Sequence, residues 1–291
     1  MDEKINLSVV IPVYNEQETI KQTISEIKQA LSDQELDWEI IAVNDFSKDE
    51  SRNIIESLPD VKLINHPYNK GYGASLKTGI KNSKYQWVAI IDGDGTYPAT
   101  AIPELIKYAK EYDMVSGNRT GKHRDRRWLY SQKLAKYILV KLANYVTNSR
   151  IDDINCGLRI YKKNVLMKYW SLYPERFSFT ATSLLAFLNN SYAVKFVPIT
   201  YYERSGKSGI KPIKDFYGFI NLILKISLYF QPLKIFIPIS LTFLLLAILV
   251  IIYSIFLSDK FLDTTTIILA VSSVQTLFFG LLAELIVKKD R

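Results

Sequence analysis

Two carboxylates separated by a glycine, Asp92-Gly93-Asp94, stand directly after an apolar run of this sequence. Carboxylate oxygens are hard ligands that suit a divalent cation, and a glycine lets a ligand approach the backbone closely. A cation held there would bridge a diphosphate and neutralise the charge that develops when the diphosphate leaves. An isolated Asp-Gly-Asp is more often a surface turn. Because this one follows residues 87–91, which have the pattern of a buried strand, a binding site is the better interpretation.

Four short apolar runs in the N-terminal part have the pattern of strands, and helical patterns follow the first three. The runs lie at residues 7–13, 38–43, 61–64 and 87–91. Strands that alternate with helices in this way predict an α/β fold with a Rossmann-like, mostly parallel sheet covered by helices on both faces.

Two of the intervening helices have a predicted start. Asn15 precedes Glu18 by three residues, and Ser47 precedes Glu50 by the same interval, which is the spacing of a capping box. We therefore expect one helix to begin at Asn15 and another at Ser47. The third helix is expected at residues 73–81.

The polar residues that follow the apolar runs are the first candidates for chemistry, because ligands of parallel sheets bind beyond the carboxyl ends of the strands. Tyr14 and Glu16 follow the first run, and Asn44 and Asp45 follow the second. Together with residues 92–94, they predict one site at a single edge of the sheet.

The net charge of +8, from 37 basic and 29 acidic residues, indicates an anionic partner such as nucleic acid, a membrane surface or a phosphorylated substrate. Residues 119–141 contain eight Lys or Arg and one acidic residue, interleaved with aromatic residues. A second basic stretch, residues 204–234, contains the amphipathic segment 216–230. This mixture is typical of helices at an anionic lipid surface. We therefore expect a lipid bilayer as partner and no nucleic acid.

Two long apolar runs, at about residues 235–257 and 264–287, have the length that a transmembrane helix needs. The second contains one ionisable residue, Glu284, one turn before its expected partner Lys288. Basic residues flank the pair of runs, whereas the short link between them is net negative. By the positive-inside rule, the catalytic part and both termini are expected on the cytoplasmic side of the inner membrane. Two buried helices of a soluble core are the alternative.

The expected organisation is therefore a cytosolic catalytic domain at 1–210, amphipathic juxtamembrane helices at 211–234 and a two-helix transmembrane hairpin at 235–291. The first ten residues lack the basic and apolar regions of a signal peptide.

The side chains that often act as nucleophiles or bases are few. The single cysteine, Cys156, cannot form an intrachain disulfide and is expected to be a packing residue. The two histidines, His66 and His123, are expected to be loop residues without a chemical role.

Seven motifs follow one another in the order found in family 2 glycosyltransferases of the GT-A fold. They are SVVIPVYNE, VNDFSKD, NKGYGASLKTG, IDGDGTYP, SGNR, DINCGLR and ERSGKSGIKP. More narrowly, the chain resembles the polyprenyl-phosphate glycosyltransferases, which include dolichyl-phosphate mannose synthases and bactoprenol glucosyltransferases. Bacterial members of that group also end in two transmembrane helices, so the resemblance covers essentially the whole chain.

The resemblance implies a nucleotide-sugar site. Its matched positions are Pro12, Tyr14, Glu16, Asp45, Gly73, Asp92, Gly93, Asp94 and Lys207. Asp45 would read the edge of the base, and Asp92 and Asp94 would contact the ribose–diphosphate region and Mg²⁺ or Mn²⁺. Two residues depart from the family: Asn44 replaces an Asp, and Thr96 replaces a Gln that binds the metal. The metal position that the Gln fills in the family would therefore be taken here by the hydroxyl of Thr96 or by a water.

The resemblance also implies an acceptor site. Arg127 and Ser131 share one face of a helix by their spacing, and with Arg119 they would hold the phosphate of a lipid acceptor. Arg204 and Lys207, in the loop at 203–208, would close on the donor diphosphate. The residues assigned to catalysis are Asp94, Arg119, Arg127, Ser131 and Arg204.

The function that this resemblance implies is transfer of a hexose from a nucleotide-sugar to polyprenyl phosphate, with inversion, at the cytoplasmic membrane face. A UDP-sugar and undecaprenyl phosphate are favoured, with GDP-mannose as the second donor. Asp153, Gly157 and Arg159 would support the sugar pocket. A processive polysaccharide synthase and a non-catalytic, membrane-tethered sugar-nucleotide-binding protein are the alternatives, and homo-oligomer formation is left open.

Overall fold

The computed structural model describes residues 5–119, 130–176, 178–202, 212–256 and 263–289, with the side chains of 130–136, 212–217, 219 and 263 left out. The chain divides into two compact units, Met1–Phe216 and Tyr217–Arg291. Each unit is described below by itself.

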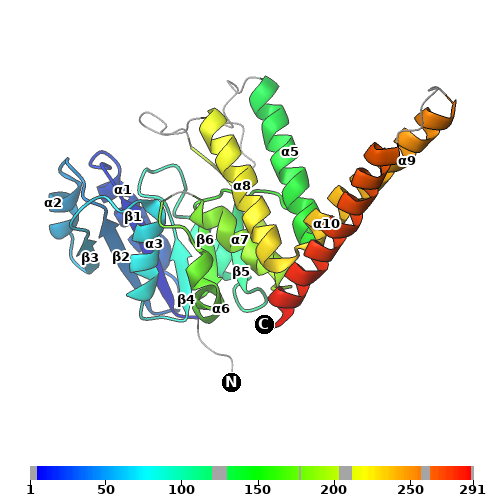
Figure 1. Ribbon diagram of the computed structural model, residues 1–291. Coiled ribbons are helices and arrows are strands. Elements are labelled where there is room, and N and C mark those ends of the chain that lie inside the picture. Colours follow the sequence, from blue (N-terminus) through cyan, green and yellow to red (C-terminus); the bar gives the residue numbers. More distant parts are fainter. Residues whose placement is uncertain (1–4, 120–129, 177, 203–211, 257–262, 290–291) are drawn as a thin grey trace. The chain divides into compact units, whose positions relative to one another are not determined.

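The first unit is built on a seven-stranded sheet with the strand order β3-β2-β1-β4-β6-β5-β7 (Figure 1). The strands are β1 (Leu7–Val13), β2 (Trp38–Asn44), β3 (Val61–Asn65), β4 (Trp87–Ile90), β5 (Met114–Arg119), β6 (Arg159–Lys162) and β7 (Val194–Ile199). All neighbouring strands are parallel except for β6, which runs antiparallel to both β4 and β5. The predicted mostly parallel α/β fold is therefore confirmed.

Helices cover both faces of this sheet. The side chains of β1 alternate between these two faces, and all of them are buried. Those of Leu7, Val9, Ile11 and Val13 belong to one core with residues of α1 (Ile20–Ser32) and α4 (Ala101–Ile106). On the other face, Gly79 of α3 (Tyr72–Lys81) lies directly over Val10. Every residue of β1 is buried, which explains the continuous apolar run.

The register of the sheet brings three strand ends together. Val13 pairs with Asn44, and Asn44 pairs with Asn65. The residue that directly follows each of these three strands therefore lies at the same edge of the sheet. These residues are Tyr14, Asp45 and His66. The ladder continues there, because the Asp45 amide donates to the Val13 carbonyl and the His66 amide donates to the Asn44 carbonyl.

The predicted starts of two helices are wrong. Helix α1 begins at Ile20 and α2 (Ser51–Glu56) begins at Ser51, and neither shows a side-chain cap hydrogen bond. Asn15 and Ser47 instead take part in hydrogen bonds between the loop after β1 and the loop after β2. The Asn15 amide donates to Ser47 Oγ at 3.0 Å, and the Lys48 amide donates to Asn15 Oδ1 at 2.8 Å. These polar residues join the loops after β1 and β2.

The second half of the first unit supplies the remaining helices. They are α5 (Tyr130–Thr147), α6 (Lys163–Lys168), the 3₁₀ turn η1 (Trp170–Leu172) and α7 (Phe179–Asn189). Helix α7 is apolar and buried along nearly its whole length. The exposed side chains of α5 include Tyr137, Ile138 and Tyr145.

The second unit contains most of α8 (Pro212–Phe230) and the helices α9 (Leu233–Phe256) and α10 (Asp263–Lys289). In α8, Ile223, Ile226 and Phe230 are buried and Leu224 and Leu228 are exposed, as expected for an amphipathic helix. Helices α9 and α10 are long and apolar enough to cross a membrane, and most of their side chains are exposed.

The two long helices pair as a hairpin through small residues. Ser240 Oγ donates to the Ser273 carbonyl at 2.9 Å, and Ser273 Oγ donates to the Ser240 carbonyl at the same distance. A Cβ at Gly280 would lie 2.6 Å from the Phe236 Cβ, so glycine is required for this close approach. The predicted pairing of Glu284 with Lys288 is present at 3.5 Å.

Candidate functional site

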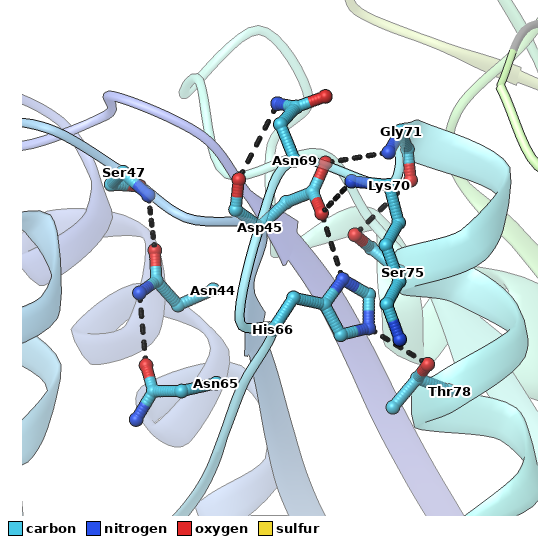
Figure 2. Close-up of polar contacts among 10 residues, drawn as sticks. All are labelled: Asn44, Asp45, Ser47, Asn65, His66, Asn69, Lys70, Gly71, Ser75 and Thr78. Carbon is cyan, nitrogen blue, oxygen red and sulfur yellow. Dashed lines mark hydrogen bonds and ion pairs between the residues drawn. The ribbon is translucent and has the colours of Figure 1, made fainter.

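The best-defined polar cluster at the strand ends surrounds Asp45 (Figure 2). The side chain of Asp45 is 5% exposed. Its Oδ1 accepts from the Lys70 amide at 2.8 Å and lies 2.7 Å from His66 Nδ1, and its Oδ2 accepts from the Gly71 amide at 2.8 Å. The side chain of Asn69 donates to the Asp45 carbonyl. The loop before α3 is thus folded around one carboxylate.

His66 lies outside regular secondary structure, as expected of a loop residue, but its side chain has partners that the sequence did not reveal. It follows β3 directly, is buried, and bridges Asp45 to Thr78 of α3, with Nε2 at 2.9 Å from Thr78 Oγ1. Sequence reasoning missed it because its partners lie 21 and 12 residues away. The only available signal was its position at a strand end. His123 lies outside the described residues.

The residues expected to form the first nucleotide loop follow β1 as predicted. Pro12 is within β1, opposite Val43, and the side chain of Tyr14 is 44% exposed. The Glu16 amide donates to Ser51 Oγ at 2.8 Å, which joins this loop to α2.

Two more exposed aromatic side chains, those of Phe46 and Tyr68, lie near this edge of the sheet. Phe46 follows Asp45 with a φ of 62°, an unusual conformation for a bulky residue, and Tyr68 follows β3. Phe46 and His66 also help to line a pocket of about 360 Å³ at the ends of β2 and β3. Exposed aromatic faces beside a polar pocket suit a planar ligand.

Asp92 and Asp94 follow β4 and are half-buried, and each accepts a hydrogen bond from a hydroxyl group. Tyr72 Oη donates to Asp92 Oδ1 at 2.8 Å, and Thr96 Oγ1 donates to Asp94 Oδ1 at 2.6 Å. Burial and the neighbouring Asp92 raise the pKa of Tyr72 well above its ordinary value, so this phenol stays a donor. The Thr19 hydroxyl donates to the carbonyl of Gly93.

The described residues contain no group of three or more His, Cys, Asp or Glu side chains placed to hold a metal ion. Asp92 and Asp94 nevertheless provide carboxylate oxygens on neighbouring positions of one turn. That donor set fits a hard divalent cation which takes its remaining ligands from a diphosphate and water.

Gly157 explains how the DINCGLR segment approaches this pair of carboxylates. A Cβ at Gly157 would lie 2.2 Å from Asp92 Oδ2, so any larger residue would displace this carboxylate. The Gly157 amide donates to Tyr97 Oη at 2.8 Å, and the ring of Tyr97 packs edge-on against Tyr201. The sequence analysis did not assign a role to Tyr72, Tyr97 or Tyr201.

Gly73 lies at the N-terminus of α3, where packing accounts for the glycine. A Cβ at Gly73 would lie 2.1 Å from the Pro174 carbonyl oxygen. The amides of Gly73 and Ala74 donate to the carbonyls of Arg176 and Glu175. These donors hold the segment before α7, so the predicted nucleotide contact of Gly73 stays a prediction.

Arg119, at the end of β5, forms a two-point ion pair with Asp153. Its Nε and Nη2 donate to Asp153 Oδ2 and Oδ1 at 2.6 and 2.7 Å, and its guanidinium lies over the Tyr201 ring. Burial alone would raise the pKa of Asp153, but the hydrogen bonds and charge of Arg119 lower it below its ordinary value. The sequence analysis named both residues but not their pairing.

Two further residues of the DINCGLR segment are structural. Arg159 is fully buried and donates to the carbonyls of Thr180 and Ile154, so it fixes the start of α7 and does not reach into an open pocket. Cys156 is fully buried, and burial raises the pKa of its thiol to about 12, as suits the packing residue that was predicted.

The remaining predicted site residues fall outside the described residues or side chains. Arg127, Arg204 and Lys207 lie outside the described residues. Ser131 lies in the first turn of α5, but its side chain is also outside the described part.

The structure is a Rossmann-like α/β domain with polar side chains gathered at the carboxyl ends of the strands, where ligands of such sheets bind. Residues 8–170 match the family described as Glycosyl transferase family 2. This match covers more than half of the chain, and the chain therefore belongs to that family. Residues 231–288 match the GtrB C-terminal hairpin. The resemblance seen in the sequence is confirmed.

Two similar curated proteins carry the same name. The chain is 28% identical to undecaprenyl-phosphate 4-deoxy-4-formamido-L-arabinose transferase of Shewanella sediminis, over 75% of this chain and 63% of the relative. It is 31% identical to the protein of that name from Proteus mirabilis, over 56% of this chain and 51% of the relative. The chain thus spans less than two thirds of the length of these two relatives.

Solved structures share the fold. Glucosyl-3-phosphoglycerate synthase from Mycobacterium tuberculosis in complex with Mn²⁺, UDP-glucose and phosphoglyceric acid has a TM-score of 0.59 at 15% identity, over 77% of this chain and 80% of that one. Staphylococcus aureus TarS 1–349 in complex with UDP has a TM-score of 0.53 at 18% identity, over 87% and 73%. At these identities the likeness shows the fold alone, which is the GT-A fold that was expected.

Proposed function

We propose that this protein transfers a sugar from a nucleotide-sugar, with a UDP-sugar favoured, to undecaprenyl phosphate at the cytoplasmic face of the inner membrane. The observation that carries this proposal is the combination of two features in one chain. Carboxylates occupy the strand ends of a family 2 domain, and an apolar hairpin follows at 231–288. The printed names of the relatives support the lipid phosphate as acceptor.

On the donor side, the chain offers complementary groups for the parts of a nucleotide-sugar. Asp45 is a buried acceptor for an N–H group of the base, and Tyr14 is an exposed ring beside it. Asp92 and Asp94 lie two strands away from Asp45 in the sheet order, where the ribose and diphosphate of the same ligand would extend. Tyr72 and Thr96 keep these carboxylates oriented through their hydroxyl donors.

Asp92 and Asp94 are also the residues that would hold Mg²⁺ or Mn²⁺. When bound, such a cation supplies positive charge to the diphosphate as it leaves. Thr96 already donates its hydroxyl and its amide to Asp94 Oδ1, so we infer that it orients this ligand, whether or not its oxygen is itself a third ligand.

On the acceptor side, a lipid phosphate needs no catalytic base. A phosphate monoester has a second pKa of about 6 and is largely ionised at neutral pH, so it is itself the nucleophile. Arg127, Ser131 and Arg119 would position it, and Arg204 and Lys207 would close on the donor diphosphate. Because Asp153 binds both Nε and Nη2 on one edge of the Arg119 guanidinium, this cation is held in one orientation. Attack from the side opposite the leaving group would invert the anomeric centre.

The membrane part would keep the domain at the surface where the acceptor lies. Helices α9 and α10 form the proposed transmembrane hairpin, and Lys288 and Lys289 at its end agree with a cytoplasmic C-terminus. The exposed Tyr137 and Ile138 of α5, with Lys141 4.8 Å from the Tyr137 ring, suit a position in the headgroup layer.

The experiment that tests this function is transfer of radiolabelled sugar into a chloroform-soluble, acid-labile lipid. Membranes that contain the full chain are incubated with a panel of labelled nucleotide-sugars, undecaprenyl phosphate and Mn²⁺. Wild type should form a lipid with one sugar, and Asp94→Ala should lose at least about 100-fold of the rate. Glu104→Gln, an exposed position of α4, is the control and should retain the wild-type rate.

Full activity in Asp94→Ala would contradict the assigned site. Long polymeric products would favour the processive synthase, and binding without any labelled lipid would favour a non-catalytic protein.

A further inference from the structure

We propose that His66 is a positioning residue which orients Asp45 and limits this carboxylate to one further hydrogen-bond donor, so that the site selects a base with a single N–H group on its binding edge. This inference rests on the proposed function, because it assumes that Asp45 reads the base of a nucleotide-sugar. It adds a residue that the motifs did not assign and a physical reason for preferring one nucleotide.

The hydrogen bonds of Asp45 leave little capacity for a ligand. A carboxylate offers about four lone-pair positions, two on each oxygen. On Oδ1 both are used, by the Lys70 amide and by His66 Nδ1. On Oδ2 the Gly71 amide uses one. Among the described contacts, one lone-pair position of Oδ2 therefore remains for a donor on the ligand.

Thr78 fixes the orientation of the imidazole ring. Because the Asp45 carboxylate is an acceptor, His66 Nδ1 carries the proton of that hydrogen bond. Nε2 then accepts from the Thr78 hydroxyl at 2.9 Å, and this bond anchors the ring to α3. The ring is also buried, with no more than a few per cent of its surface exposed. The Asp45 carboxylate is thus held by hydrogen bonds from two backbone amides and from the ring of His66.

The two candidate bases place different demands on this carboxylate. The binding edge of uracil has one donor, N3–H, between two carbonyl acceptors. Guanine has two adjacent donors, N1–H and N2–H, which a carboxylate binds best with both of its oxygens. A carboxylate with one oxygen saturated meets the demand of uracil and leaves one donor of guanine unpaired. An unpaired buried donor loses its hydrogen bond to water without a replacement, so we expect a preference of about tenfold.

The neighbouring surface is consistent with a planar base at this position. The exposed rings of Tyr14, Phe46 and Tyr68 all follow strands that end at this edge, and His66 and Phe46 line the same pocket. Base stacking on aromatic rings does not depend on the identity of the base. Discrimination between bases is therefore left to Asp45 and the residues that hold it.

The test is calorimetric titration of the purified full chain, in detergent with Mn²⁺, using UDP and GDP as probes. Wild type should bind UDP at least about tenfold more tightly than GDP. His66→Gln keeps a polar side chain of similar length but does not place a donor at Oδ1. It should weaken UDP binding about tenfold and bring the two dissociation constants to within about threefold.

His66→Asn is the matched rescue, because its amide nitrogen lies close to the position of Nδ1. It should keep UDP affinity within about threefold of wild type and keep the preference. If His66 had a merely structural role, both variants would have the same shift in melting temperature, and their nucleotide affinities would not differ from each other.

Three results would overturn the proposal: a His66→Gln protein that binds both nucleotides like wild type, equal loss of affinity in both variants, or tighter binding of GDP than UDP by wild type. In each of these cases the lipid-transfer assay described above still decides the proposed function independently. A wild-type chain that binds neither nucleotide and transfers no sugar would instead remove the proposed function, and with it this inference.

Discussion

Two buried carboxylates of the same domain are held in opposite ways. Asp153 accepts two hydrogen bonds from the guanidinium of Arg119, so its charge is balanced by a cation. Asp45 is equally inaccessible, yet its described donors are two backbone amides and the ring of His66. One carboxylate is part of an ion pair, and the other keeps its capacity to accept from a neutral group.

We propose that this difference separates a supporting role of Asp153 from a recognition role of Asp45. The Asp153 ion pair orients Arg119 and consumes the hydrogen-bonding capacity of both partners on that side. Asp45 is held by two loop amides and His66, and among the described contacts it retains one acceptor position. Four changes test this comparison, and they are ordered from the largest expected effect to the smallest.

Removal of Arg119 should have the largest effect on stability. Arg119→Ala leaves the buried Asp153 charge without its partner, which costs about 3–5 kcal/mol in comparable pairs. Chemical unfolding of the full chain in detergent, followed by tryptophan fluorescence, measures the loss. The double variant Arg119→Ala/Asp153→Ala is the control and should recover part of it. A single variant as stable as wild type would mean that the ion pair is not a structural unit.

Removal of Asp45 should act mainly on ligand binding. Asp45→Ala deletes the acceptor for the base and leaves the Lys70 and Gly71 amides unpaired. UDP affinity should fall about 100-fold, which corresponds to about 2.7 kcal/mol. Asp33→Ala, an exposed carboxylate after α1, is the control and should bind UDP like wild type. Unchanged titration curves for Asp45→Ala would contradict the recognition role.

The Asp153 ion pair should also make the folding stability of the protein depend on pH. The pKa of Asp153 is lowered in the folded state, so its contribution is fully present above the unfolded pKa of about 3.9 and is lost as the pH falls through the lower folded value. The difference in melting temperature between wild type and Asp153→Asn should therefore be largest near pH 6 and shrink below about pH 4. A difference that stays constant down to about pH 3 would contradict this coupling.

Removal of the Tyr72 hydroxyl should have the smallest effect. Tyr72→Phe deletes one hydrogen bond to Asp92 and leaves the ring in place, so kcat/KM for sugar transfer should fall about fivefold, close to 1 kcal/mol. Tyr85→Phe, at the opposite end of the strands, serves as the control. If both variants kept the wild-type rate, the hydroxyl would not orient Asp92 during the reaction.

Much of the fold and part of the site could be predicted because their signals are local in sequence. Continuous apolar runs predict buried parallel strands, and the polar residues directly after them are therefore placed at one edge. Asp45, Asp92 and Asp94 were found in this way. The long apolar segments of α9 and α10 are equally local signals.

The rest depends on contacts that are distant in sequence. His66 binds a residue 21 positions away, Tyr72 one 20 positions away, and Gly157 donates to a tyrosine 60 positions away. The predicted helix starts were wrong for the same reason. The Asn15 amide bonds to the side chain of Ser47, 32 residues further on, where a local capping box was expected.

The most direct test of the account is mass spectrometry of the lipid product. Vesicles that contain the full chain and undecaprenyl phosphate are incubated with Mn²⁺ and an equimolar panel of UDP- and GDP-sugars, and the extracted lipids are analysed. The account predicts a single new lipid, undecaprenyl phosphate carrying one sugar, which comes from a UDP-sugar and is absent with Asp94→Ala. An extract without any sugar-bearing lipid, from a chain that binds UDP, would contradict it.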